Sequence, residues 1–333
     1  MEKGSNLRLS RRRLLGAAAA LPCVGARAQS GWQPTRPVEY VVPAGPGASV
    51  DTSVRMLKEI LERRKIVPTP IIVSNRPGGA GSIAINLVNS GNLDGHTLTT
   101  YTHAMLHYKL LGEARATWTD LTPIAVFFEE GAVVAVRADS PIRDTRDLVS
   151  RLRADPGSVP IGMATALGNH VHAAIAKPLK VAGVNIAKLT MVPFKSSNES
   201  VTALLGGHIG AVVATASNLV TPKTSGRARV LATMSPTRLS SPLDDVPTWR
   251  EQGVDVDYSS MQGVLGHRGM TPEQVDFWVR AFRQATETDE WRQFLVKQQL
   301  KPQFIGGADM LRFMQSEEAV ARGLLTELGL YKG

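Results

Sequence analysis

The stretch VEYVV (Val38–Val42), followed by PAGPGASVD (Pro43–Asp51), decides the fold that we expect for this chain of 333 residues. The first five residues form an apolar run that is typical of a buried strand. The glycine- and proline-rich loop then leads into Thr52–Arg64, where apolar residues recur at helical spacing. A strand, a loop and a helix in this order predict the first unit of an α/β fold.

The same order of elements recurs along the chain. Further strands are predicted over 71–74, 97–101, 132–136, 159–163, 189–192, 209–214 and 230–234. Helices are predicted over 82–89, 144–153, 170–181, 198–205, 272–286, 289–299 and 308–328. Strand–loop–helix units in series indicate a sheet with parallel strands. We therefore expect two α/β lobes with a C-terminal helical return, and a ligand crevice at the carboxyl ends of the strands.

The N-terminus carries the pattern of a twin-arginine export signal. The basic segment Ser10–Leu15 precedes the short apolar run Gly16–Leu21, and Ala26–Ala28 has the A-x-A form of a cleavage site. The apolar run is far shorter than the roughly 20 residues that a membrane span needs. We therefore expect residues 1–28 to be removed and the mature protein to begin near Gln29, in the periplasm. The alternative is a basic N-terminus that arose by chance.

The charge of the chain is concentrated in this signal. The first 28 residues hold six of the 38 basic residues and one of the 29 acidic residues, which leaves 32 basic and 28 acidic ones. The body has no basic tract interleaved with aromatic residues, so we expect no nucleic-acid partner.

Cys23 is the only cysteine and lies in the segment to be removed, so we expect the mature chain to have neither a thiol nucleophile nor a disulfide.

The loop Gly45–Ser49 is the first candidate for binding. Its glycines let a ligand approach the backbone, and the helix that follows offers free N–H groups and a positive dipole end. These features favour a carboxylate or a phosphate, although a tight turn without a ligand is the alternative. The second glycine loop, Pro77–Gly81, is predicted to be structural.

Metal and hydrolytic sites have little support in the sequence. His103 and His107 are four residues apart, and His170 and His172 are two apart, but neither pair has a third ligand at metal-site spacing. We expect no metal and no cofactor. No serine lies in a Gly-x-Ser-x-Gly elbow. An exported hydrolase stays open as a rival interpretation.

Eight stretches, taken in order, resemble the Bug-type periplasmic solute-binding receptors of tripartite tricarboxylate transporters. They are Val41–Asp51, Val73–Gly81, Asp94–Leu98, Val192–Ser196, Leu204–Ile209, Gly226–Ala232, Asp245–Gly253 and Gly263–Pro272. The resemblance implies a two-lobed Venus flytrap of the type II periplasmic-binding class. It implies a first lobe of residues 35–126 and 245–333, a second lobe of residues 127–244, and a ligand cleft between them.

The resemblance also implies which residues bind the ligand, mostly through backbone N–H groups and ordered waters. The positions carried over are Pro46, Gly47, Ala48, Ser49, Asp51, Thr102, His103, Ala164, Thr165, Gly168, Asn169, His170, Ser196, Asn198, Thr215 and Asn218.

Three departures from the family pattern concern the ligand. Ala48 stands where a second glycine is usual, and Met163–Asn169 carries fewer hydroxyl groups than usual. Ala214–Ala216 replaces an acidic residue followed by asparagine. The missing acid leads to the hypothesis of a ligand without an amino group.

Together these features predict an exported, non-enzymatic receptor for a small organic anion, in the first place a carboxylate. We expect a monomer that closes on its ligand and hands it to the membrane permease subunits of a transporter. A sensor subunit that presents its ligand to a kinase is a second rival, which the sequence does not separate from a transport receptor.

Overall fold

The computed structural model describes residue 1, residues 31–256 and residues 258–332. The predicted export signal lies outside the described residues. All that follows concerns the compact unit Trp32–Gly333. Among the helices that the structure describes, none has both the length and the apolar content that crossing a membrane requires.

The first lobe is built on a mixed sheet. Its strands run in the order β2-β1-β3-β9-β4, and β10 also pairs with β4. Their bounds are β1 Val38–Val42, β2 Ile71–Asn75, β3 Thr97–Thr102, β4 Thr122–Arg137, β9 Ser259–Gly266 and β10 Leu300–Gly306. β1 pairs in parallel with β2 and β3, whereas β9 is antiparallel to both β3 and β4.

The second lobe continues from the same long strand. Here the order is β4-β7-β5-β6, with β8 also paired to β4. The bounds are β5 Ile161–Ala164, β6 Met191–Phe194, β7 Ala211–Thr215 and β8 Ala228–Thr233. β5 is parallel to β6 and β7, and β4 is antiparallel to β7 and β8.

β4 passes from one lobe into the other. Its residues up to Gly131 pair with β9, and its residues from Ala132 pair with β7. Ser235 and Leu239 lie so close to Gly131 that a Cβ atom there would meet the Ser235 hydroxyl at 2.5 Å. A glycine therefore stands where the strand leaves the first sheet.

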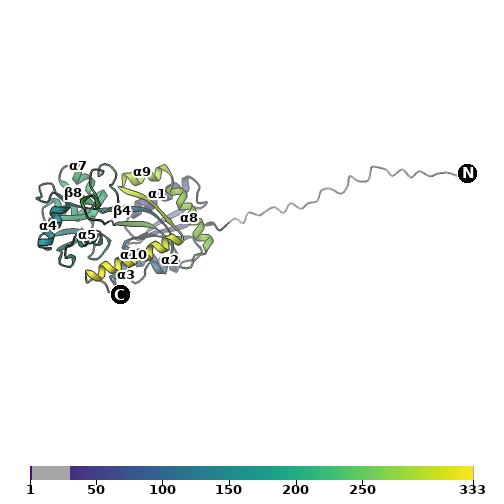
Figure 1. The fold of residues 1–333 in the computed structure, drawn as a ribbon. Helices are drawn as coiled ribbons and strands as arrows, with labels where there is room; N and C mark the ends of the chain where they lie inside the picture. Colours follow the sequence, from purple (N-terminus) through teal and green to yellow (C-terminus); the bar gives the residue numbers. More distant parts are fainter. Residues whose placement is uncertain (2–30, 257, 333) are drawn as a thin grey trace. The chain divides into compact units, whose positions relative to one another are not determined.

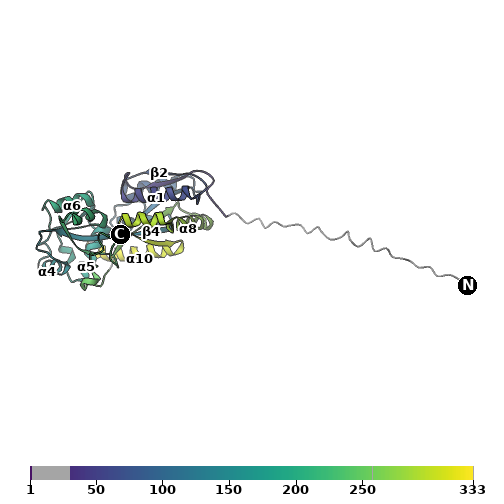
Figure 2. The same ribbon diagram turned by 90° about the horizontal axis from the view of Figure 1, so that it is seen from above.

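Helices cover both lobes, as Figures 1 and 2 show. The first lobe carries α1 Ser49–Arg63, α2 Ser82–Ser90, α3 Ala104–Leu110, α8 Pro272–Thr286 and α9 Asp289–Lys297. The second carries α4 Thr145–Ala154, α5 His170–Val181, α6 Ser197–Leu205 and α7 Val220–Thr224.

The last helix, α10 (Ala308–Glu327), contacts both lobes. Met310 and Met314 lie in the apolar core of the first lobe, while Leu324 lies in that of the second. In Figure 1 this helix is the yellow one that extends from the first lobe toward α5. β4 and α10 are thus two connections between the lobes.

The predicted α/β architecture is confirmed, and α5 and α8 have the predicted bounds. The prediction of parallel strands holds for β1, β2, β3, β5, β6 and β7, but is wrong for β4, β8, β9 and β10, which pair antiparallel. The sequence prediction missed α3, α7, β9, β10 and the first ten residues of β4. Pro123 and the pair Glu129–Glu130 interrupt the apolar pattern of β4, although most of that strand is buried.

Candidate functional site

A cavity of about 450 Å³ opens where the two lobes meet. The loop after β1, the second glycine loop and the start of α3 line it from the first lobe. The first residue of α5 and the end of β7 line it from the second, and β4 and β9 pass beside it. The lining residues are Pro43, Ala44, Ala48, Ser49, Val50, Gly78, Ala80, Gly81, Thr102, His103, Ala104, Met105, Tyr108, Glu130, His170, Thr215, Ser260 and Gln262.

The N-terminus of α1 faces this cavity. Ala48 is its N-cap residue, and no side chain caps the helix. The first N–H groups of any α-helix lack an acceptor within the helix, and they carry the positive end of its dipole. Ser49 and Val50, which both line the cavity, therefore offer backbone donors to an anion.

Asp51 holds the loop that presents these donors. Its carboxylate accepts hydrogen bonds from the Gly47 N–H at 2.9 Å and from Asn75 Nδ2 at 2.9 Å. Arg55 Nε donates to the same carboxylate at 3.0 Å. Burial of Asp51 opposes its charge, but these hydrogen bonds outweigh that effect and lower its pKa below the ordinary value. Asp51 does not line the cavity and acts on it through the loop.

Glu130, on β4, brings a carboxylate to the cavity. Ser49 Oγ donates to its Oε1 at 3.3 Å, and Gln262 Nε2 donates to its Oε2 at 3.2 Å. Burial raises the pKa of Glu130, and the hydrogen bonds from Ser49, Gln262 and Ser260 reduce that rise. The side chain lies next to the point where β4 changes lobes.

Two histidines line the cavity in neutral form. Burial is the main cause that lowers the pKa of His170 to about 3 and the pKa of His103 well below its ordinary value. The Nδ1 atom of each ring has no hydrogen-bond partner among the described residues. At neutral pH these rings can donate or accept a hydrogen bond, but they bring no charge to the cavity.

The structure brings six of the predicted binding residues together around the cavity. These are Ala48, Ser49, Thr102, His103, His170 and Thr215. The other predicted positions do not line it: Pro46, Gly47, Asp51, Ala164, Thr165, Gly168, Asn169, Ser196, Asn198 and Asn218.

Several of these outlying residues have a structural role in the described chain. Asn169 caps α5, accepting from the N–H groups of Val171 and His172 at 3.0 Å. Ser196 caps α6 by accepting from the N–H of Glu199. Whether they also contact a ligand when the lobes close stays a prediction.

Sequence reasoning did not find Glu130, Ser260 and Gln262. β9 was not predicted as a strand, so its pairing with β4 was not expected. Ser260 lies opposite Glu130 in that pairing, and this places the two side chains at one edge of the cavity. The acidic pair Glu129–Glu130 inside an otherwise apolar stretch was the signal that could have drawn attention to this position.

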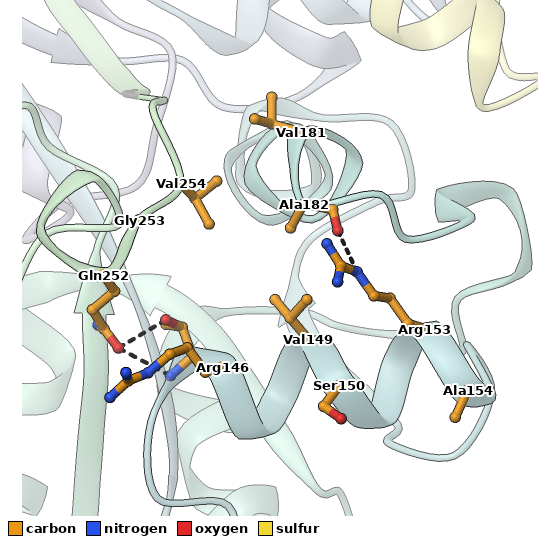
Figure 3. A pocket seen from close by; sticks show the side chains of 11 residues that line it. Arg146, Val149, Ser150, Arg153, Ala154, Val181, Ala182, Gln252, Gly253 and Val254 are labelled. Carbon is orange, nitrogen blue, oxygen red and sulfur yellow. Dashed lines mark hydrogen bonds between the residues drawn. The ribbon is translucent and has the colours of Figure 1, made fainter.

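A second cavity, of about 630 Å³, lies within the second lobe (Figure 3). Val149 of α4 and Val254 point into it, and Arg153 turns back to donate to the Ala182 carbonyl oxygen at 2.6 Å. Gln252 accepts from the hydroxyl and the N–H of Thr145 at its rim. Val149 lies in the apolar core of the second lobe and Val254 packs against that core, so closure of the lobes would not enclose a ligand there. We therefore place the candidate site in the cavity between the lobes.

Comparison with known proteins agrees with this architecture. Residues 54–330 match the model of the tripartite tricarboxylate transporter family receptor. The UPF0065 protein in the gbd 5' region of Cupriavidus necator is 28% identical over 319 residues, which cover 95% of this chain and 94% of that protein.

Two solved structures share the fold. A TctC solute-binding protein from Polaromonas, solved without ligand, is 26% identical with a TM-score of 0.74 and covers 88% of this chain and 99% of that one. A protein of R. palustris solved with adipate is 26% identical with a TM-score of 0.73 and covers 89% of this chain and 98% of that one. The predicted two-lobed periplasmic-binding fold is confirmed. The family match extends over most of the sequence. The chain therefore belongs to the receptor family of the tripartite tricarboxylate transporters, whose members are periplasmic solute-binding proteins.

Proposed function

We propose that this protein captures a small carboxylate in the cavity between its lobes and delivers it to the membrane permease subunits of a tripartite tricarboxylate transporter. The observation that carries the proposal is the uncapped N-terminus of α1 at that cavity. It offers backbone donors and a positive dipole end to an anion, while the histidines there are neutral.

The related structures support the choice of ligand class. The R. palustris protein, 26% identical to this chain, was solved with adipate, a dicarboxylate. Ala48, Ser49, Thr102, His103, His170 and Thr215 form the binding set that we propose from among the predicted residues. The protein would act as a receptor without catalysis, as a monomer, after export through the twin-arginine pathway. Residues 35–126 with 245–333, and residues 127–244, would form the two closing lobes, with Trp249 and Val256 packed in the core of the second.

A thermal-shift screen tests this proposal. The purified, processed protein is heated with members of a panel of carboxylates, amino acids, vitamins and aromatic acids. A ligand that binds only the folded state must raise the melting temperature by mass action. We expect a rise of several degrees with carboxylates. A rise only with compounds that lack a carboxylate contradicts the proposal, as does the absence of any rise for protein that has been unfolded, stripped of small molecules and refolded.

A further inference from the structure

Among the described residues, the carboxylate of Glu130 in the cavity between the lobes has no cationic partner. Its hydrogen-bond donors there are uncharged, namely Ser49 Oγ at 3.3 Å, Gln262 Nε2 at 3.2 Å and the Ser260 side chain. Among the described residues that line the cavity there is no lysine and no arginine. Glu130 is half-buried, and a carboxylate that is partly removed from water is costly unless a cation or strong hydrogen bonds compensate for the loss.

Gln262 adds a second unmatched acceptor. Its side chain is only 6% exposed and lines the cavity. Because its Nε2 donates to Glu130, its Oε1 is left to accept, and that atom has no partner among the described residues. An acceptor buried without a donor is costly, so a ligand that supplied a donor here would gain affinity. Glu130 and Gln262 together form what we call the acceptor pair.

The acceptor pair lies beside the anion-binding end of α1. Ser49 is the first residue of α1, and its hydroxyl donates directly to Glu130. The N–H that Ser49 offers to an anion and the hydroxyl that contacts Glu130 thus belong to the same residue. A ligand that uses both must carry its hydrogen-bond donor only a few bonds from its carboxylate.

We propose that the protein selects carboxylates that carry a protonated amine close to the carboxylate, as an α-amino acid does. The carboxylate would bind the N–H groups at the start of α1, and the ammonium would bind Glu130 and Gln262 Oε1. This inference rests on the proposed function. It opposes the hypothesis of a ligand without an amino group, which rested on the acid that is missing at Ala214–Ala216. Glu130 of β4 supplies an acid in its place.

The electrostatics of Glu130 favour an ammonium over a second carboxylate. Burial raises its pKa, which shows that its charged form is poorly solvated where it lies. A ligand ammonium would supply the missing cation and form charge-assisted hydrogen bonds, which are roughly twice as strong as neutral ones. A dianionic ligand would instead bring a like charge toward Glu130, or require Glu130 to take up a proton.

Calorimetric titration with matched ligand pairs tests the inference. The pairs are succinate with aspartate, glutarate with glutamate, and adipate with 2-aminoadipate, whose members differ only by the amine. We expect the amino member to bind at least about tenfold more tightly in every pair that binds. A diacid that binds as tightly as its amino partner overturns this inference but leaves the proposed function intact. No binding by any member overturns this inference, and the proposed function falls with it only if no carboxylate of the thermal-shift panel raises the melting temperature.

Two variants identify the residue responsible. Glu130→Gln keeps the shape of the side chain but removes its charge, and we expect it to abolish the preference for the amine, so that the two members of each pair bind with similar affinity. Glu129→Gln is the matched control, because Glu129 accepts from Ser259 Oγ and does not line the cavity. An unaltered preference in Glu130→Gln overturns the assignment to Glu130.

The pH dependence of wild-type binding gives a readout that needs no variant. The groups that line the cavities around Glu130 with it include Ser49 of α1, Ser260 and Gln262 of β9, His103 before α3, Tyr108 of α3, His170 of α5, and Tyr258. His103 and His170 have lowered pKa values and Tyr258 a raised one, so all three stay neutral between about pH 5 and 8. A charged Glu130 attracts an ammonium and repels a second carboxylate, so the ratio of amine affinity to diacid affinity should not fall as the pH rises. A ratio that falls with rising pH contradicts the proposal.

Discussion

The ring of His107 donates a hydrogen bond from Nδ1 to the carbonyl oxygen of Gly168, at 2.8 Å. His107 lies on α3 in the first lobe, and Gly168 lies in the loop before α5 in the second. The N–H of Gly168 in turn donates to Nδ1 of His172 at 2.9 Å. This loop, which was predicted to hold a ligand, is therefore fixed between two histidines at a contact between the lobes.

Gly168→Ala should lower stability through both its backbone and its surroundings. The residue has φ +82°, and a Cβ atom would lie 2.6 Å from Leu111 Cδ2 and 3.0 Å from Leu325 Cδ2. Positive φ costs about 1 kcal/mol for alanine, and overpacking adds about 1–3 kcal/mol. Urea unfolding measures the sum. Gly226→Ala is the control, because φ is +69° and nothing lies within 4 Å of its Cβ position. Equal losses in the two variants would show that the leucine contacts carry no cost.

Stability should fall as the pH drops from about 6.5 to 4. Burial is the main cause that lowers the pKa of His107 to about 4, of His170 to about 3 and of His172 to about 4. In this range the unfolded chain binds protons that the folded chain excludes, so unfolding is favoured at lower pH. Each proton that only the unfolded chain binds lowers the free energy of unfolding by about 1.4 kcal/mol for each pH unit of acidification.

Urea unfolding at a series of pH values measures this slope. His107→Gln should reduce this slope by the contribution of about one proton, because the unfolded variant has no imidazole at this position to protonate. A stability profile that is flat over this range, or that rises toward acid, would contradict the neutral, buried state of these rings.

Asp51→Ala should destabilise the protein by about 1–3 kcal/mol, because it leaves the N–H of Gly47 without its acceptor and removes one of the two acceptors of Asn75 Nδ2. Arg55→Gln should cost less than about 1 kcal/mol, since the Arg55 side chain is half exposed.

The lowered pKa of Asp51 contributes stability above about pH 4, which is lost as the pH falls through the lowered value. Asp51→Asn should remove that acid-side loss. Full stability of Asp51→Ala would refute its role as the holder of the loop.

Local sequence signals predicted the elements that depend on local patterns. The start of α5 follows the capping residue Asn169, and α8 begins with Thr271 and Pro272 in a capping box, so both helices could be predicted to the residue. β9 lacks such a signal. It lies in the sheet between β3 and β4, and its register with both is a tertiary property.

The site was predictable in part for the same reason. His170 begins a helix whose start was predicted, and Ser49 lies in the glycine loop that was predicted to precede a helix. Glu130 and Gln262 reach the cavity only because β4 and β9, more than a hundred residues apart, pair beside it. Asp51 and Asn169 were assigned to the ligand by the family resemblance. The chemistry of their side chains also suits holding a loop or capping a helix, and only the structure distinguishes these uses.

The most direct measurement is calorimetric titration of an Ala48→Trp variant with the carboxylate that gives the largest thermal shift for the wild type. Ala48 has extended backbone, with φ −63° and ψ 156°, and lines the cavity, so an indole there would fill the space between the lobes without straining the chain. Val296→Trp places the same side chain on the exposed face of α9 as a control. The account predicts that Ala48→Trp loses binding while its melting temperature without ligand stays close to that of Val296→Trp. Undiminished binding by Ala48→Trp would contradict the assignment of the ligand to this cavity.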